Sequence, residues 1–315
     1  MATTTSITTT YAGEFAGKYI SAALLSGETL DRGNIEIKPN VKFKEIIKTF
    51  SSDSNVIKDA TCDFTDTATI TLAERVIQPE EFQVNLELCK KDFRSDWEAI
   101  QMGYSSFDNL PPKFSDFLIG HVAAKVAQKT EQNIWGGVNG NAGEFDGFTV
   151  SMAADSDVND AANGSETSFT SSNIVTLLSN VVDAIPNAVY GKEDLKIYVP
   201  PVAWQAYIRH LGGYGANGLG AAGYKSEGNQ WWNSNASLSF EGIELLYTPG
   251  MPSDHMVAGQ KSNLYFGTGL ISDHNEVKVI DMADLDGSQN VRVVMRFTAG
   301  VQYGIASDLV LLTLA

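Results

Sequence analysis

Apolar and polar residues alternate along much of the first ninety positions of the chain. An alternation of period two is typical of β-strands. It runs through residues 35–43 and again through residues 62–72, and the polar segment 51–59 joins the two stretches. This pattern predicts a long hairpin. Because the hairpin contains few large apolar residues, we expect it to need another surface to lie on. A further strand is predicted at residues 82–88.

Farther along the chain, the apolar spacing changes to three and four residues, as in an amphipathic helix. The clearest case is residues 112–135, a segment that begins after Pro111 and stops at Gly136. Proline is tolerated in the first turn of a helix, and this helix would span about 35 Å. Shorter helices are predicted at residues 11–25, 91–102, 171–185 and 201–211. Ser171 or Ser172 is the expected N-cap of the third of these.

Strands return in the second half of the sequence. They are predicted at residues 195–199, 243–247, 263–267, 277–280, 291–298 and 309–314. The order is therefore strand-rich, then helical, then strand-rich again. That order predicts an α+β fold, because a doubly wound sheet would need regular alternation of strands and helices.

Composition narrows the class of protein. Of the 315 residues 43% are hydrophobic, and 22 Lys+Arg stand against 38 Asp+Glu, which gives a net charge of −16. The apolar content excludes global disorder. The scarcity of basic residues argues against a general nucleic-acid binder and against docking on anionic lipid. With two cysteines, no signal-peptide pattern and no long apolar run, we expect a soluble protein of a reducing compartment.

The sequence offers little catalytic chemistry. Residues 213–218 have the G-x-G-x-x-G spacing of dinucleotide sites, but no predicted strand precedes them, and residues 218–226 miss the P-loop spacing by one residue. The four histidines lack the spacing of zinc ligands, and there is no G-x-S-x-G elbow. The sequence therefore predicts neither an enzyme nor a bound cofactor.

One acidic segment resembles a calcium-binding loop. Asp155, Asp157, Asn159 and Glu166 have the spacing of calcium ligands, but the sixth position, where the chain should turn sharply at a glycine, is Asp160. A solvated acidic loop is the favoured interpretation. A loosely bound cation is the alternative.

Several segments together carry a family resemblance. Residues 194–204 (DLKIYVPPVAW) lead from a strand into a helix, residues 242–252 (GIELLYTPGMP) lead from a strand into a turn, and residues 291–310 contain two closing strands. In this order, after the hairpin and the long helix, they resemble the major capsid protein of tailed double-stranded DNA phages. That family has the Hong Kong 97-type, or Johnson, fold.

The resemblance covers nearly the whole chain and implies its organisation. It implies an N-terminal arm (1–33), an E-loop hairpin (34–78), a peripheral domain with a long spine helix (79–170 and 263–305) and an axial domain (171–262 and 306–315). It also implies a structural, non-enzymatic protein of the virion, assembled in the host bacterial cytoplasm. Such subunits self-assemble into hexamers and pentamers of an icosahedral head that encloses DNA.

The resemblance places the assembly contacts in the arm, the hairpin and the axial loop. The expected residues are Tyr11, Phe15, Lys42, Phe43, Lys44, Lys58, Tyr214, Trp231 and Trp232. Separate scaffolding, portal and decoration proteins are the implied partners. Because 14 of the 22 Lys+Arg lie in residues 1–150, we expect the hairpin to meet an acidic neighbour. Two alternatives stay open: an encapsulin-type compartment shell and, from a different class, a calcium-dependent binding module.

Overall fold

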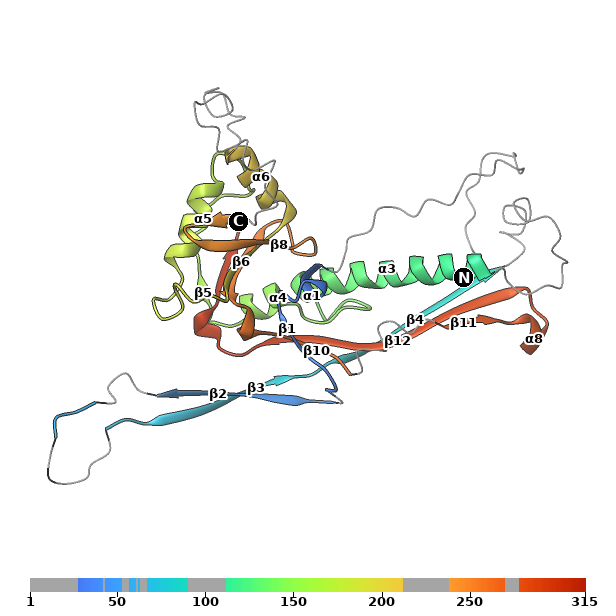
Figure 1. Cartoon of the computed structure of the whole chain (residues 1–315), viewed down its shortest axis with the longest axis horizontal. Coiled ribbons are helices and arrows are strands. Elements are labelled where there is room, and N and C mark those ends of the chain that lie inside the picture. Colours follow the sequence, from blue (N-terminus) through green and yellow to red (C-terminus); the bar gives the residue numbers. More distant parts are fainter. Residues whose placement is uncertain are drawn as a thin grey trace.

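The computed structural model describes residues 28–41, 43–52, 57–60, 62, 67–89, 112–211, 238–269 and 278–315. The helices predicted at residues 11–25 and 91–102 lie outside these ranges. The described part consists of a long sheet with a helix along it, a compact sheet with helices beside it, and a hairpin that projects from the body (Figure 1). Among the described helices, none is both long and apolar enough to cross a membrane.

The long sheet is built around β12 (Asn290–Tyr303). Its other strands are β1 (Glu36–Lys38), β4 (Glu80–Cys89), β10 (Leu264–Gly267) and β11 (Lys278–Asp281). β4, β10 and β11 all pair with β12, and β1 pairs with β10. In β12 the buried residues Val291, Val293 and Met295 alternate with more exposed ones. This alternation is typical of a sheet with one covered face.

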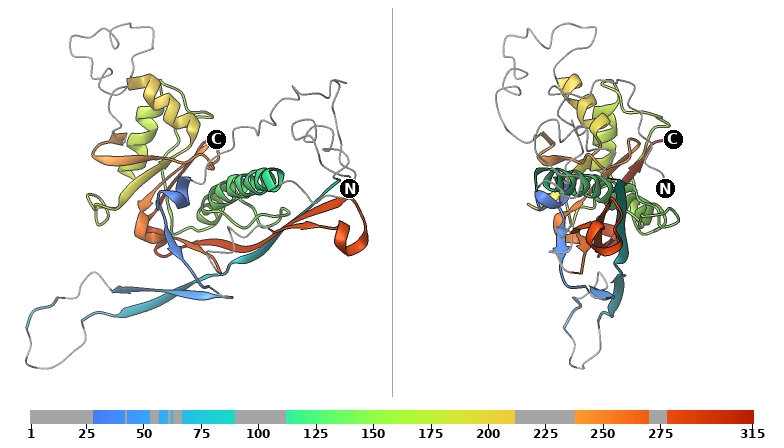
Figure 2. Two further views of the ribbon diagram at one scale, coloured as in Figure 1. Left: turned by 45° about the vertical axis from the view of Figure 1, so that its right-hand side comes forward. Right: turned by 90° about the vertical axis from the view of Figure 1, so that its right-hand side faces the viewer.

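A single long helix, α3 (Pro112–Gly136), covers that face of the long sheet (Figures 1 and 2). It confirms the helix predicted at residues 112–135. Val122 and Val126 pack with Val293 of β12 and with apolar side chains of β4 and β11. Because residues four apart lie on the same side of a helix, one stripe of α3 is enough to cover the sheet.

The compact sheet has the strand order β5-β13-β9-β6-β8-β7. Its strands are β5 (Asn159–Asp160), β6 (Leu195–Val199), β7 (Ser239–Phe240), β8 (Ile243–Tyr247), β9 (His255–Gln260) and β13 (Val310–Thr313). Two helices, α5 (Ile174–Asp183) and α6 (Pro201–Leu211), share its core, in which Leu177 and Val181 of α5 join Ile197 of β6. The short elements are α1 (Glu28–Asp31), α4 (Phe148–Ala153), α8 (Ala283–Asp286), η1 (Lys261–Asn263) and η3 (Ala306–Asp308).

The last turn of α3 joins the two sheets. Trp135 is fully buried, and the centre of its ring lies 4.9 Å from that of Tyr198 in β6 and 5.5 Å from that of Phe148 in α4. Its Nε1 donates to Oγ1 of Thr29 in α1 (3.0 Å), and the amide of Thr29 donates to the buried carboxyl group of Glu131 (3.2 Å). One aromatic side chain thus contacts elements that are far apart in sequence, and its single donor is satisfied, as a buried indole requires.

Three glycines allow the backbone to pass close to α3. A Cβ at Gly250, in the turn after β8, would lie 2.2 Å from the carbonyl oxygen of Glu131. At Gly137 and Gly147 it would lie 2.4 and 2.6 Å from backbone oxygens. No side chain fits at such distances, so this close approach explains two of the glycines in the glycine-rich segment 136–147.

The second strand of the predicted hairpin begins later than expected. The alternation at residues 62–72 predicted a strand there, but β3 spans Ile70–Ile77, and Cys62 and residues 67–69 are not in a strand. The physical reason lies in the composition of the segment. Residues 62–69 contain two aspartates, which are depleted in strands, whereas residues 70–77 contain none and include the strand-favouring Ile70, Val76 and Ile77.

Two further details differ from the sequence predictions. β9 was not predicted, because its four central residues are all buried and do not alternate. The α5 helix begins after Asn173, not after Ser171 or Ser172. Thr170 and Asn173 exchange hydrogen bonds between side chain and backbone at this end, in the manner of a capping box.

The contact between Gly250 and α3 can be tested by adding one methyl group. We expect Gly250→Ala to lower the free energy of unfolding by about 3 kcal/mol, because the backbone of α3 would have to move. Gly140→Ala is the matched control: a Cβ there meets no atom within 4 Å, and the change should stay within about 0.5 kcal/mol. Urea unfolding followed by circular dichroism measures both, and equal losses would contradict this account.

Candidate assembly surface

The hairpin consists of β2 (Glu45–Ser52) and β3 (Ile70–Ile77), paired antiparallel along their whole length. The register places Ile46 opposite Val76 and Phe50 opposite Leu72. Directly opposed residues point to the same side of a ribbon, and so do residues two apart along a strand. These side chains therefore gather on one face of the hairpin.

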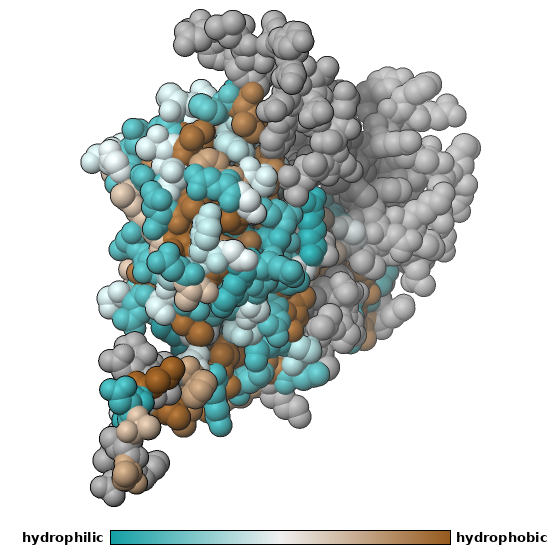
Figure 3. Space-filling view, turned by 60° about the vertical axis from the view of Figure 1, so that its left-hand side comes forward, coloured by the Kyte–Doolittle hydropathy of each residue, from teal (hydrophilic) through white to brown (hydrophobic). Residues whose placement is uncertain are grey.

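We call this surface the apolar hairpin face: Ile46, Phe50, Ile70, Leu72 and Val76. Its members are between 39% and 77% exposed. Figure 3 shows the hairpin projecting from the body with apolar side chains on its surface. The exposed residues Lys48 and Glu74 lie on the same face, between the Ile46–Val76 and Phe50–Leu72 pairs, so the apolar surface has two parts. Large apolar side chains gathered in solvent on one face are uncommon on monomeric proteins and mark interaction sites. The face therefore has the character of a contact surface.

The opposite face of the hairpin is anchored near the body and polar farther out. Ile47 and Ile77 are buried there with Val41 and the ring of Tyr265. Beyond them the face carries small or polar residues: Thr49 of β2, and Thr71 and Ala73 of β3. The hairpin is thus fixed at its base, and its apolar side is directed elsewhere.

A polar cluster also holds the base of the hairpin. Nη2 of Arg75 in β3 donates to Oδ2 of Asp155 (2.6 Å), and its guanidinium lies 4.5 Å from the ring centre of Tyr303 in β12. The Tyr303 hydroxyl donates to the same Asp155 oxygen (2.8 Å). We call Arg75, Asp155 and Tyr303 the clasp.

The clasp changes the ionisation of two of its members. Burial opposes ionisation of Asp155, but hydrogen bonds from Arg75, the amide of Asp157 and Tyr303 outweigh it, and the pKa of Asp155 is lowered. Burial, together with the hydrogen bond to Asp155, raises the pKa of Tyr303 to about 12. At neutral pH the clasp therefore joins a cation, an anion and a neutral phenol.

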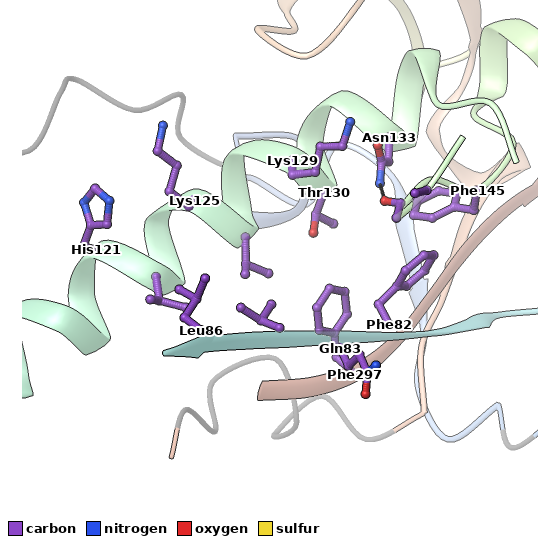
Figure 4. A pocket seen from close by; sticks show the side chains of 15 residues that line it. Phe82, Gln83, Leu86, His121, Lys125, Lys129, Thr130, Asn133, Phe145 and Phe297 are labelled. Atoms are coloured by element: carbon purple, nitrogen blue, oxygen red, sulfur yellow. Dashed lines mark hydrogen bonds between the residues drawn. The ribbon is translucent and has the colours of Figure 1, made fainter. Parts of the chain in front are cut away.

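A groove of about 430 Å³ lies between α3 and the long sheet (Figure 4). Its floor and walls are mainly apolar, with Val122 and Val126 among them. Phe82, Phe145 and Phe297 meet at one end, where the ring centre of Phe82 lies 5.9 and 5.7 Å from those of the other two. The groove lies where α3 packs on β4 and β12.

The predicted assembly residues are only partly covered by the structure. Phe43 is 71% exposed just before β2, Nζ of Lys44 lies 5.6 Å from its ring centre, and Lys58 is exposed beyond the end of β2. The other predicted residues lie outside the described ranges: Tyr11, Phe15, Lys42, Tyr214, Trp231 and Trp232. The apolar hairpin face is not among the predicted assembly residues, although the apolar residues at positions 70, 72 and 76 are a signal for it.

The hairpin is not a basic element. Residues 34–78 contain six Lys+Arg and seven Asp+Glu. Of these, Lys38 pairs with Glu45 (2.9 Å), and Arg75 pairs with Asp155. The concentration of Lys+Arg in residues 1–150 therefore does not make the hairpin positive.

The predicted cation loop is occupied by other contacts. Asp155 belongs to the clasp, Nδ2 of Asn159 donates to two backbone oxygens near η3, and Glu166 accepts from Asn173. Within the described ranges, no group of three or more His, Cys, Asp or Glu is placed to hold a metal ion. The glycine-rich segments at residues 213–218 and 218–226 lie outside those ranges.

Comparison with known proteins gives structural matches alone. No protein-family model matches the chain, and no curated protein matches its sequence. A chain in the capsid of a native GTA particle aligns with a TM-score of 0.60 and 13% identity, covering 95% of this chain and 94% of that chain. A chain in the capsid of the Myoviridae phage XM1 aligns with a TM-score of 0.58 and 13% identity, covering 94% of this chain and 95% of that chain. A chain of Gordonia phage Cozz aligns with a TM-score of 0.58 and 12% identity, covering 95% of this chain and 89% of that chain.

These alignments show the fold. The chain has the α+β fold of tailed-phage capsid proteins, as the resemblance in the sequence implied. They give no support to the encapsulin or the calcium-module alternative.

The occupied cation loop leads to a prediction about calcium. Because Asp155 and Glu166 already accept hydrogen bonds, we expect titration with Ca²⁺ to release no heat beyond that of dilution. Isothermal calorimetry on the wild-type protein and on Asp157→Ala measures this. A binding heat that disappears in the variant would show that the loop is a calcium site.

Proposed function

We propose that this chain is the structural subunit of a tailed-phage head, a major capsid protein that forms hexamers and pentamers of an icosahedral shell around double-stranded DNA. The observation that carries the proposal is the apolar hairpin face on a hairpin that projects from the body. A subunit that keeps apolar side chains in solvent is completed by its neighbours, and a closed shell repeats the same contact many times.

The magnitude of the contact fits reversible assembly. Fully burying a Leu, Ile, Val or Phe side chain contributes about 1.5–3 kcal/mol. The five partly exposed side chains of the apolar hairpin face therefore supply several kcal/mol per contact, part of which the loss of subunit freedom offsets. A single contact is then weak, and a shell gains its stability from many contacts made together.

The fold also suggests how the chain is organised within a shell. We assign residues 1–33 to an arm, residues 34–78 to the E-loop, α3 to the spine helix, and the two sheets to the peripheral and axial domains with the boundaries predicted above. The net charge of −16 opposes adhesion of DNA to the shell wall. We further propose separate scaffolding and portal proteins as partners, with decoration proteins as an optional addition, and no enzymatic role for the subunit.

The role of the apolar hairpin face can be tested with two substitutions. We expect Phe50→Ser combined with Leu72→Ser to prevent shell formation while leaving the subunit folded, because both side chains are largely exposed in the single chain. Negative-stain electron microscopy and sedimentation velocity measure assembly, and circular dichroism measures folding. The matched control, Thr49→Ser with Thr71→Ser, changes the opposite face of the same strands and should assemble like the wild type. If the variant with both serines forms normal shells, the apolar hairpin face has no role in assembly.

The arm gives a second test. Deletion of residues 1–27 keeps the buried contact between Thr29 and Glu131 and removes the predicted arm contacts Tyr11 and Phe15. We expect the shortened chain to fold but to form no shells of normal size. If electron microscopy shows wild-type shells, the arm has no part in assembly.

A further inference from the structure

We propose that Arg75 is a positioning residue: through Asp155 and Tyr303 it fixes the direction in which the hairpin leaves the body, and release of this clasp lets the hairpin change direction between neighbours. The inference rests on the proposed function, because hexamers and pentamers present neighbours to the same chain at different angles.

One of the two links between the hairpin and the body is only two residues long. β3 ends at Ile77 and β4 begins at Glu80, so Gln78 and Pro79 alone separate them. Proline has no N–H and cannot continue a ladder of hydrogen bonds. Beneath this link, a Cβ on Gly300 of β12 would lie 3.0 Å from Gln78 and Pro79, so the strand crosses β12 at close range. A change of direction is therefore concentrated at this crossing.

The contacts at the base of the hairpin differ in whether they can fix its direction. Ile47 and Ile77 are held by apolar packing against Val41 and Tyr265, which is not directional and can act as a pivot. The clasp is directional, because a guanidinium donates along fixed N–H bonds to a carboxylate. Two other directional contacts lie nearer the base: Nε2 of Gln302 donates to the carbonyl oxygen of Val76 (3.2 Å), and Lys38 pairs with Glu45 (2.9 Å). Arg75 lies farther out along β3 than either contact, so its contact sets the angle about that pivot.

The clasp joins three parts of the molecule. Arg75 lies on the hairpin, Tyr303 ends the central strand of the long sheet, and Asp155 lies between α4 and β5, the first strand of the compact sheet. The side chains of Arg75 and Asp155 are 27% and 18% exposed. Water reaches the ion pair, so it can open without leaving a charge in a dry core.

A distance measurement within one chain tests the proposal directly. Nitroxide labels at Thr71→Cys on the hairpin and Asn85→Cys on β4, with Cys62→Ser and Cys89→Ser, lie on either side of the link and at most about 46 Å apart. Pulsed electron–electron double resonance gives the distribution of that distance. The labelled full-length chains are diluted into unlabelled chains, so that each measured distance lies within one chain. We expect one narrow distribution, and at least a twofold greater width in Arg75→Ala.

The control is a variant that removes a charge from the hairpin itself and leaves the clasp intact. Lys48 lies opposite Glu74 in the register, and Lys48→Ala should leave the width unchanged. An unchanged width in Arg75→Ala, or an equal increase in Lys48→Ala, would overturn the proposal. If Arg75→Ala fails to fold, Asp155→Asn carries the test, since it removes the charge and keeps an oxygen for Tyr303. An unchanged width in that variant is equally decisive.

Electron microscopy adds a functional measurement. Shells of Arg75→Ala should show a broader range of diameters than wild-type shells, whereas uniform wild-type shells would contradict the role in assembly. If the wild-type chain forms no shells at all, the proposed function fails, while the distance distributions still decide whether the clasp sets the direction of the hairpin. The two failures are therefore distinguishable.

Discussion

The burial of Trp135 is the packing constraint on which both sheets depend. Its ring contacts Tyr198 of the compact sheet and Phe148 of α4, and its nitrogen is held by Thr29. An indole in this position needs close neighbours on every side and a partner for its N–H. The close approach of Gly250 to α3 follows from the same requirement, because the turns around the helix end must come near enough to enclose it. The two sheets therefore share a core around the last turn of α3.

The hairpin differs from the body in how its apolar side chains are buried. Inside the body, apolar side chains are buried by the same chain, as Val293 is by α3. On the hairpin, burial stops at Ile47 and Ile77, and beyond them the apolar side chains are exposed. The residues that stabilise the fold are thus separate from those of the exposed apolar hairpin face. A substitution on that face should have little effect on folding, whereas one at the α3 junction lowers the stability of the chain itself.

Local patterns account for what could be predicted from sequence. The prolines at 111–112 and 200–201 mark helix starts, and the spacing of three and four gives α3 and α5, so these elements follow from nearby residues alone. β9 could not be found in this way, because buried strands do not alternate. The apolar hairpin face needs the pairing register, which depends on where β3 begins. In the clasp, Asp155 is separated by 80 positions from Arg75 and by 148 positions from Tyr303, so no local pattern reveals it.

The continuity of β3 and β4 has a mechanical consequence. A pull on the hairpin passes across Gln78 and Pro79 into β4, which is paired with β12 at ten successive positions. The hydrogen bonds of an antiparallel pair are perpendicular to the strands. Tension along β4 therefore loads all ten positions together in shear and does not open them one after another. A pull on the hairpin is therefore resisted along the direction in which the pairing of β4 with β12 is strongest.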